Sequence, residues 1–344
     1  MTDDRVEDTV AWMNKEYGES TGTVGIYVPD CPRLRIGIMA FDIASGGGIA
    51  LGRMNMFWGT ESSGKTNLAL KCVAAFQTKF PELKCVFIDV ECTLTKKWAK
   101  AMGVDIDKLI YVRPGYAEQV VNIVERLLHA EDCGLIVIDS IAAMTKMQEL
   151  ESDAEKANVG GVGLAIGKLV RKCTSALNSA SKEGRIPTLI WINQIRYKVG
   201  IVFGNPETLP GGEAQKYMAT LRVRLSGKNE MDAQVSKTMP VMKRTKGVLQ
   251  KWKVPIIAPN LEYAMAMVPH KGLQIGESDD WPVIYQFLKE YDLVGKGENG
   301  KGWVCMGEEF KTLSEIKEYM KDSERLDALM SRIMAESEKT LGDS

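Results

Sequence analysis

The sequence predicts an α/β fold in which a mainly parallel sheet is covered by helices on both faces. Strand patterns alternate with helical patterns from residue 36 to residue 269. Several strands are nearly continuous in apolar residues, which is typical of strands that are buried on both faces. A glycine-rich loop joins one strand to the next helix. With 344 residues, 45% of them hydrophobic, the chain can build one large domain with appendages or two domains.

The core elements are expected in the following order. Apolar runs predict buried strands at 54–58, 85–89, 109–112, 135–139 and 188–192. Helical spacing of apolar residues predicts helices at 67–76, 95–102, 118–130 and 162–183. Three later runs, at 221–225, 247–252 and 264–268, are expected as added strands. Residues 36–269 therefore form the predicted central unit.

Both ends of the chain predict smaller units. Apolar residues recur every three or four positions between residues 4 and 17, which indicates an amphipathic helix, and a connector follows to residue 35. A short isolated helix is marginal in water, so we expect residues 1–35 to pack on something else, such as another subunit. Residues 270–344 place helices around a glycine-rich hairpin at 295–303. They predict a small α+β domain that ends in a polar tail.

Residues 59–66 form a complete G-x-x-x-x-G-K-T phosphate loop. Its members are Gly59, Thr60, Glu61, Ser62, Ser63, Gly64, Lys65 and Thr66. The glycines let the backbone curl so that several N–H groups point at the phosphates of a nucleotide. Lys65 is expected to reach those phosphates, and the Thr66 hydroxyl to ligate Mg²⁺. Since the motif lies between a strand pattern and a helix pattern, the sequence predicts binding of ATP or another nucleoside triphosphate.

Three further residues are candidates for this site. Asp139 ends the strand 135–139, where its carboxylate is expected to face Mg²⁺ through water. Glu91 follows the strand 85–89 at the same sheet edge, so it is the candidate for orienting the attacking water and accepting its proton. The alternative for Glu91 is an exposed loop acid. Trp98 could stack on adenine, although an aromatic residue within a helix is more often part of the core.

Charge and cysteine content restrict the class of protein. Seven cysteines without a C-x-x-C pair favour reduced thiols over a disulfide framework or a zinc site. We expect a cytoplasmic protein, because neither a signal peptide nor a membrane-spanning segment is evident. The net charge is −1, but residues 166–253 hold 17 Lys and Arg against five acids. This asymmetry indicates either one cationic surface for a polyanion or a solvated basic stretch.

Four segments resemble RecA-type recombinases closely. They are residues 41–48, 60–66, 139–143 and 192–212, and the last resembles the second DNA-binding loop of that family. The similarity runs from about Ile36 to Pro259 and continues more faintly through residues 301–303. The resemblance implies a RecA-like phosphate-loop ATPase core. The degree of divergence is compatible with a phage-encoded member.

The resemblance also implies roles for single residues. Gln194 matches a γ-phosphate sensor that couples ATP to the DNA-binding loop after it. Lys251 and Lys253 match a pair that reaches the ATP of a neighbouring subunit; without the resemblance, they would be assigned to an exposed strand. Trp98 stands where relatives have a tyrosine, so stacking on adenine is retained. Tyr217 replaces a phenylalanine at the implied subunit interface.

The resemblance implies DNA-binding loops at residues 151–163 and 196–212. Cationic side chains in and beside these loops would neutralise phosphates, and exposed apolar residues would separate the bases of a stretched strand. Backbone N–H groups of glycines would assist. The candidates are Lys168, Arg171, Lys172, Arg196, Lys198, Val199, Phe203, Gly211 and Gly212.

Together these observations predict an ATP-dependent homologous recombinase. It would form a helical filament on single-stranded DNA, test homologous double-stranded DNA and exchange strands, with Glu91, Lys65 and Gln194 as catalytic residues. ATP binding and hydrolysis would switch DNA affinity and subunit assembly, and a single-strand-binding protein and a loader are further expected partners. Two alternatives stay open: a hexameric helicase or motor of the same superfamily, and a regulatory paralogue that binds nucleotide without hydrolysing it.

Overall fold

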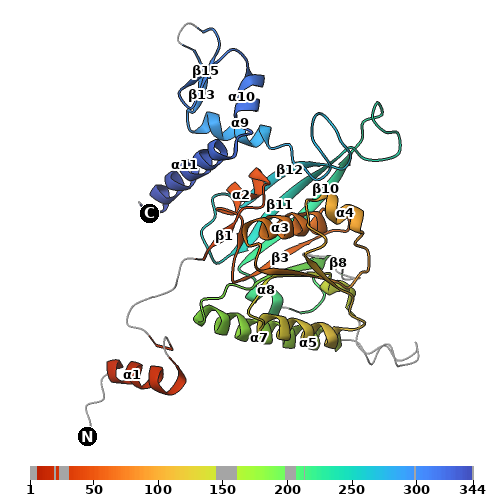
Figure 1. Cartoon of the computed structure of the whole chain (residues 1–344), viewed down its shortest axis with the longest axis vertical. Helices are drawn as coiled ribbons and strands as arrows, with labels where there is room; N and C mark the ends of the chain where they lie inside the picture. The colour runs from red at the N-terminus through yellow and green to blue at the C-terminus, as the bar shows by residue number, and fades with distance from the viewer. Residues whose placement is uncertain are drawn as a thin grey trace.

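A computed structural model of the chain describes residues 6–18, 21–22, 31–144, 161–197, 207–212, 214–297 and 300–342. Its centre is an eight-stranded sheet in the order β12-β11-β10-β3-β7-β6-β4-β5 (Figure 1). Pairing is parallel from β10 through β5. It is antiparallel between β10 and β11 and between β11 and β12. The predicted α/β class with a mainly parallel sheet is confirmed.

The strands nearest the site lie in the middle of the sheet. They are β3 (Met54–Gly59), β4 (Lys84–Asp89), β6 (Cys133–Asp139) and β7 (Thr188–Gln194), and β5 (Leu109–Val112) forms one edge. At the other side follow β10 (Leu221–Glu230), β11 (Met242–Trp252) and β12 (Asn260–Ala266). Strand β12 therefore begins four residues before residue 264, where the sequence predicts its start. Residues Met242–Val248 of β11 pair with all of Asn260–Ala266.

Helices cover both faces of the sheet, as expected. One face carries α2 (Met39–Ala44), α3 (Lys65–Lys79) and α4 (Lys96–Ala101); the other carries α5 (Ala117–Leu128) and α7 (Gly161–Lys182) (Figure 1). Successive residues of a strand point to opposite faces. Accordingly Val137 joins the core under α3, whereas Ile136 and Ile138 join the core under α5 and α7. All three are fully buried, which explains why these strands read as continuous apolar runs.

The N-terminal helix α1 (Val6–Tyr17) lies apart from the sheet and buries none of its side chains (Figure 1). Its side chain Asn14 exchanges two hydrogen bonds with the backbone of Gly22, at 2.9 and 2.8 Å. Trp12 and Tyr17 are 52% and 63% exposed. The predicted helix is confirmed; Val6, Trp12 and Tyr17 are exposed, whereas Val10 and Met13 are half-buried.

The C-terminal domain surrounds a small antiparallel sheet of β13 (Val294–Lys296), β14 (Trp303–Cys305) and β15 (Glu308–Phe310). Its helices are α9 (Trp281–Glu290), α10 (Leu313–Tyr319) and α11 (Ser323–Gly342). Helix α11 extends to Gly342, and the predicted polar tail stays a prediction. Leu329, Met330 and Ile333 recur at helical spacing and bury one side of α11 in the domain core.

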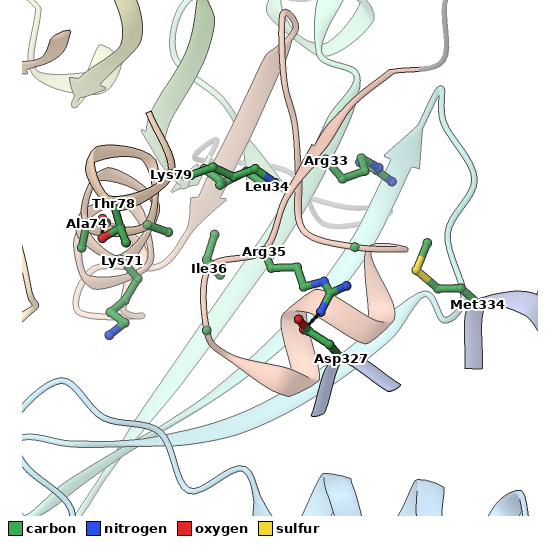
Figure 2. Close-up of a pocket in the computed structure, with 13 residues that line it drawn as sticks. Arg33, Leu34, Arg35, Ile36, Lys71, Ala74, Thr78, Lys79, Asp327 and Met334 are labelled. Atoms are coloured by element: carbon green, nitrogen blue, oxygen red, sulfur yellow. Dashed lines mark hydrogen bonds and ion pairs between the residues drawn. The ribbon is translucent and has the colours of Figure 1, made fainter. Parts of the chain in front are cut away.

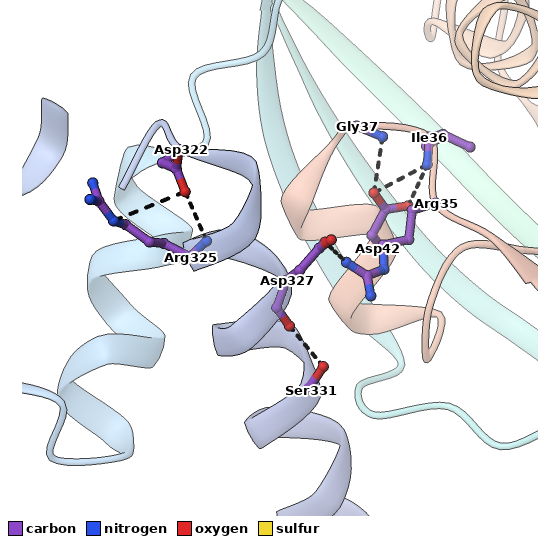
Figure 3. A network of polar contacts seen from close by, with 8 residues as sticks. All are labelled: Arg35, Ile36, Gly37, Asp42, Asp322, Arg325, Asp327 and Ser331. Atoms are coloured by element: carbon purple, nitrogen blue, oxygen red, sulfur yellow. Dashed lines mark hydrogen bonds and ion pairs between the residues drawn. The ribbon is translucent and has the colours of Figure 1, made fainter. Parts of the chain in front are cut away.

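The C-terminal domain meets the central unit at α2 and at the linker that contains β1 (Arg33–Leu34), which pairs with β2 (Ile49–Ala50). A cavity of about 670 Å³ lies there between the linker, α3 and α11 (Figure 2). Arg35 of the linker forms an ion pair with Asp327 of α11 (Figure 3). Beside it, buried Asp42 accepts hydrogen bonds from the N–H groups of Ile36 and Gly37, at 2.9 and 3.0 Å.

Candidate active site and nucleic-acid interface

The predicted nucleotide site forms at one edge of the sheet because four strands end there. Gly59 of β3 stands opposite Gln194 of β7, and Asp89 of β4 stands opposite Asp139 of β6. Since all four strands are parallel, their carboxyl ends lie at the same edge. The register therefore brings together residues that are up to 135 positions apart in the sequence, from Gly59 to Gln194.

The phosphate loop follows β3 and opens into α3. A Cβ atom on Gly59 would lie 2.0 Å from the carbonyl oxygen of Leu225, so only glycine allows β10 to pass so close. The Lys65 ammonium is buried and donates to the carbonyl oxygen of Thr60 at 2.6 Å. Burial lowers its pKa, with opposing effects from Asp139 and Glu91. A bound phosphate would offset that loss of hydration.

Thr66 and Asp139 are in direct contact, as expected of a shared cation site. The Thr66 hydroxyl donates to Oδ2 of Asp139 at 2.6 Å. Asp139 is almost fully buried, and burial raises the pKa of its carboxyl to about 6, while the hydrogen bond from Thr66 acts against this shift. A hydroxyl and a carboxylate are hard oxygen ligands of the kind that Mg²⁺ prefers. The donor set therefore fits this ion.

Glu91 and Gln194 are hydrogen-bonded to each other. The Gln194 amide donates to Oε1 of Glu91 at 2.6 Å, and the Ser140 hydroxyl donates to the same oxygen at 2.5 Å. Arg196 donates in turn to Oε1 of Gln194 at 3.2 Å. A chain of contacts thus joins the candidate water-orienting carboxylate to the first residue of the second predicted DNA-binding loop.

Trp98 lies on α4 beside the phosphate-loop helix. Its indole N–H donates to Oδ1 of Asn67 at 3.0 Å, and the half-buried ring packs at the border of the core. Thr95 caps α4 by accepting from the backbone N–H of Trp98 at 3.3 Å. Trp98 is therefore held near Thr66 by the neighbouring Asn67, while stacking on adenine stays a prediction.

Residues 151–160 of the first predicted DNA-binding loop lie outside the described residues, and its last three residues, 161–163, belong to α7. Lys168 and Arg171 are exposed on α7. Lys172 instead forms an ion pair with Glu125 of α5, so its charge is already matched within the chain. This pairing argues against a phosphate contact by Lys172.

The second predicted DNA-binding loop is closed at its base. Its ends form the strands β8 (Arg196–Tyr197) and β9 (Glu207–Thr208), which pair with each other. Arg196 is exposed there. Gly211 has a φ of +94° and would place a Cβ atom 2.5 Å from Ile166 of α7, whereas Gly212 faces open space. The candidates Lys198, Val199 and Phe203 lie outside the described residues.

Comparison with known proteins gives the family. The profile described as the RecA N-terminal domain matches residues 5–268. The chain belongs to the RecA family. Curated relatives named Protein RecA include those of Aquifex aeolicus, 42% identical over 190 residues, and Mesoplasma florum, 34% identical over 289 residues. The match spans 53% of the Aquifex protein and 83% of the Mesoplasma protein. It covers 55% and 80% of this chain, respectively.

A third relative has intermediate coverage. Protein RecA of Mesomycoplasma hyopneumoniae is 39% identical over 221 residues, which are 64% of that protein and 63% of this chain. This chain thus spans between half and two thirds of the length of the first relatives that it matches. Among the described residues, no helix is both long and apolar enough to cross a membrane.

Within this RecA-family chain, Lys251 and Lys253 lie away from the phosphate loop. Lys251 of β11 pairs with Arg222 of β10, and Arg222 pairs with Met56 in the first half of β3. Its ammonium donates to the carbonyl oxygens of Lys216 at 2.8 Å and of Tyr217. Tyr217, at the end of α8 (Ala214–Met218), is 67% exposed. The structure does not bring these lysines to the nucleotide site of their own chain.

Sequence reasoning missed two polar residues of this RecA-family site. Ser140 directly follows Asp139, and its hydroxyl helps to hold Glu91. Asp89 is buried at the end of β4 and accepts from the Tyr111 hydroxyl at 2.8 Å and from the N–H of Leu94 at 2.9 Å. The signal for Asp89 was available, because it ends an apolar strand just as Asp139 does.

Proposed function

We propose that the chain is an ATP-dependent homologous recombinase that forms a helical filament on single-stranded DNA, tests homologous duplex and exchanges strands. Membership of the RecA family supports this proposal. The observation that carries it is the hydrogen-bonded series Glu91, Gln194 and Arg196. It links a carboxylate of the nucleotide site to the base of the loop proposed to bind DNA.

In the proposed reaction, water attacks the γ-phosphorus of ATP and ADP leaves. Glu91 accepts the proton of that water, and Lys65 donates to the phosphate oxygens as negative charge develops on them. Thr66 and Asp139 would hold Mg²⁺, which supplies charge compensation for the phosphates when it is bound.

Gln194 would serve as the switch in this scheme. In the described structure the Gln194 amide nitrogen donates to Glu91, and a γ-phosphate would compete with Glu91 for this nitrogen. When the amide turns to the phosphate, Glu91 is released for water, and the strand end that carries Arg196 shifts with Gln194. ATP occupancy and DNA-loop position are thereby coupled through one side chain.

The proposed DNA path follows Lys168 and Arg171 of α7 and Arg196 at the start of the second predicted loop. Their charges would contact phosphates, so sequence preference should be weak. Lys251 and Lys253 can meet an ATP only on a second copy, because they lie far along the sheet from Gly59 of their own chain. This arrangement supports ATP hydrolysis that depends on assembly.

Steady-state ATP hydrolysis with and without a long single-stranded DNA tests the proposal. We expect strong stimulation by DNA and, with an unhydrolysable ATP analogue, open filaments in electron micrographs whose length follows the DNA. Closed rings alone would favour the helicase alternative. Hydrolysis that is indifferent to DNA would contradict the proposed coupling through Gln194.

A further inference from the structure

Strands β10 and β11 pack directly against the phosphate loop. A Cβ atom on Gly227 of β10 would lie 3.0 Å from the Cα atom of Ser63. On β11, Thr245 stands opposite Gly227 and Lys243 stands opposite Asn229. Residues two apart on a strand share a face. Both side chains therefore reach across β10 to the loop.

Lys243 makes the stronger of the two contacts. Its ammonium donates to the carbonyl oxygen of Ser62 at 2.6 Å, whereas the Thr245 hydroxyl lies 3.5 Å from the carbonyl oxygen of Ser63. Lys243 is 9% exposed and Thr245 is 1% exposed. Within the described residues no acid forms an ion pair with Lys243. A buried cation without a matching carboxylate needs another source of compensation.

We propose that Lys243 is a positioning residue of the nucleotide site, which fixes the peptide between Ser62 and Ser63 and adds a second positive charge behind the triphosphate. This inference rests on the proposed ATP-binding function. A peptide group is planar and trans, so its C=O and N–H point in opposite directions. By holding the Ser62 carbonyl outward, Lys243 directs the Ser63 N–H toward the inside of the loop, where the phosphates bind.

The backbone at Ser62 explains why such support is useful. Ser62 has a φ of +56°, in the left-handed region that costs a non-glycine residue energy. A loop that must hold this conformation before the nucleotide arrives benefits from a partner on its outer side. The charges of the two lysines also favour nucleotide binding. Burial lowers the pKa of Lys243, and the nearby charge of Lys243 contributes to lowering the pKa of Lys65. The two ammonium groups are thus close enough to repel, and a triphosphate would relieve that repulsion.

The test compares Lys243→Met, which keeps the length but removes the charge and the donor, with Lys243→Arg, which keeps both. The matched control is Lys246→Met on the same strand, where the side chain is 66% exposed and pairs with Glu262 at 3.3 Å. Isothermal titration with ADP and Mg²⁺ gives affinity, and ATP hydrolysis on single-stranded DNA gives KM and kcat. In Lys243→Met we expect Kd and KM to rise about tenfold, because a hydrogen bond from a charged group is lost. The kcat should stay within about twofold of wild type.

The outcomes separate this inference from the proposed function. Rescue by Lys243→Arg to within about threefold of wild type, with Lys246→Met unchanged, supports the inference. Unchanged nucleotide affinity in Lys243→Met overturns the inference. A loss of affinity that Lys243→Arg does not restore, and that is accompanied by a lowered Tm, also overturns it. If Lys243→Met does not fold, Lys243→Gln replaces it in the same comparison. A wild-type chain that binds no nucleotide would instead overturn the proposed function.

Discussion

At the scale of single residues, the hydrogen-bonded pair Glu91–Gln194 carries the proposed coupling between ATP and DNA. Glu91 accepts hydrogen bonds from both Gln194 and Ser140. Gln194→Ala should leave nucleotide affinity within about threefold of wild type, because the phosphate loop is untouched. It should abolish stimulation of ATP hydrolysis by single-stranded DNA, since no side chain then links the phosphate to the loop. Hydrolysis rates with and without DNA measure this, and full stimulation in the variant would contradict the proposed switch.

Lys65 provides the second prediction at this scale. Its ammonium contacts only neutral oxygens in the described structure, at Thr60, Gly59 and Ser63. Lys65→Ala should therefore cost little stability, about 1 kcal/mol or less. It should lower kcat/KM for ATP by at least about 100-fold, because the charge on the phosphates is no longer compensated. Thermal unfolding and initial rates are the measurements, and normal turnover in the variant would refute the site assignment.

At the scale of elements, the end of the second predicted DNA-binding loop packs against α7 at Ile166. Gly211→Ala combines left-handed strain with a clash at Ile166, so we expect the free energy of unfolding to fall by about 2–4 kcal/mol. Gly212→Ala is the matched control, since its φ is +77° but nothing lies near, and it should cost about 1–2 kcal/mol. Chemical denaturation gives both values. Equal losses in the two variants would show that contact with α7 does not constrain the loop.

At the scale of the whole molecule, one acid connects the C-terminal domain to the central unit, and a second acid holds the linker beside this junction. Asp280 accepts from the N–H of Met39 at 3.1 Å, and Asp42 holds the linker at Ile36 and Gly37 (Figure 3). Burial raises the pKa of each carboxyl from 3.8 to about 7. The nearby Asp280 adds to the rise for Asp42, and Asp279 adds to the rise for Asp280. The folded chain therefore keeps protons that the unfolded chain has released. Their stabilising effect is complete below about pH 4 and is lost as the pH rises to about 7.

Asp42→Asn tests this dependence, because asparagine is neutral at every pH. Relative to wild type, the variant should gain roughly 2–4 kcal/mol of unfolding free energy between pH 4 and pH 7. Asp327→Asn is the control, since the side chain is 64% exposed and its ion pair with Arg35 contributes about 0–1 kcal/mol. Denaturant unfolding at several pH values supplies the comparison. A variant with the same pH slope as wild type would show that Asp42 does not bind the extra proton.

Most of the fold could be predicted from the sequence, because local patterns carry it. The strand 109–112 was placed at its observed bounds, and helix 162–183 differs from α7 by one residue at each end. Helix 67–76 was predicted too short, since the phosphate-loop lysine and threonine form its first turn and Lys79 its last. The sequence does not predict the burial of Leu329, Met330 and Ile333, because these apolar residues are sparse in a polar segment and their packing depends on the rest of the domain.

The sequence by itself predicted the phosphate loop, and it named Asp139 and Glu91 as candidates because each ends or follows a recognisable strand. Gln194 was named through the resemblance to RecA-type recombinases. Only the tertiary structure decided which side chains meet. Lys243 lies 181 positions from Ser62, and Lys172 lies 47 positions from Glu125. No local pattern marks either contact. Sheet order and helix packing bring such residues together, and those depend on burial summed over the whole chain rather than on neighbours in the sequence.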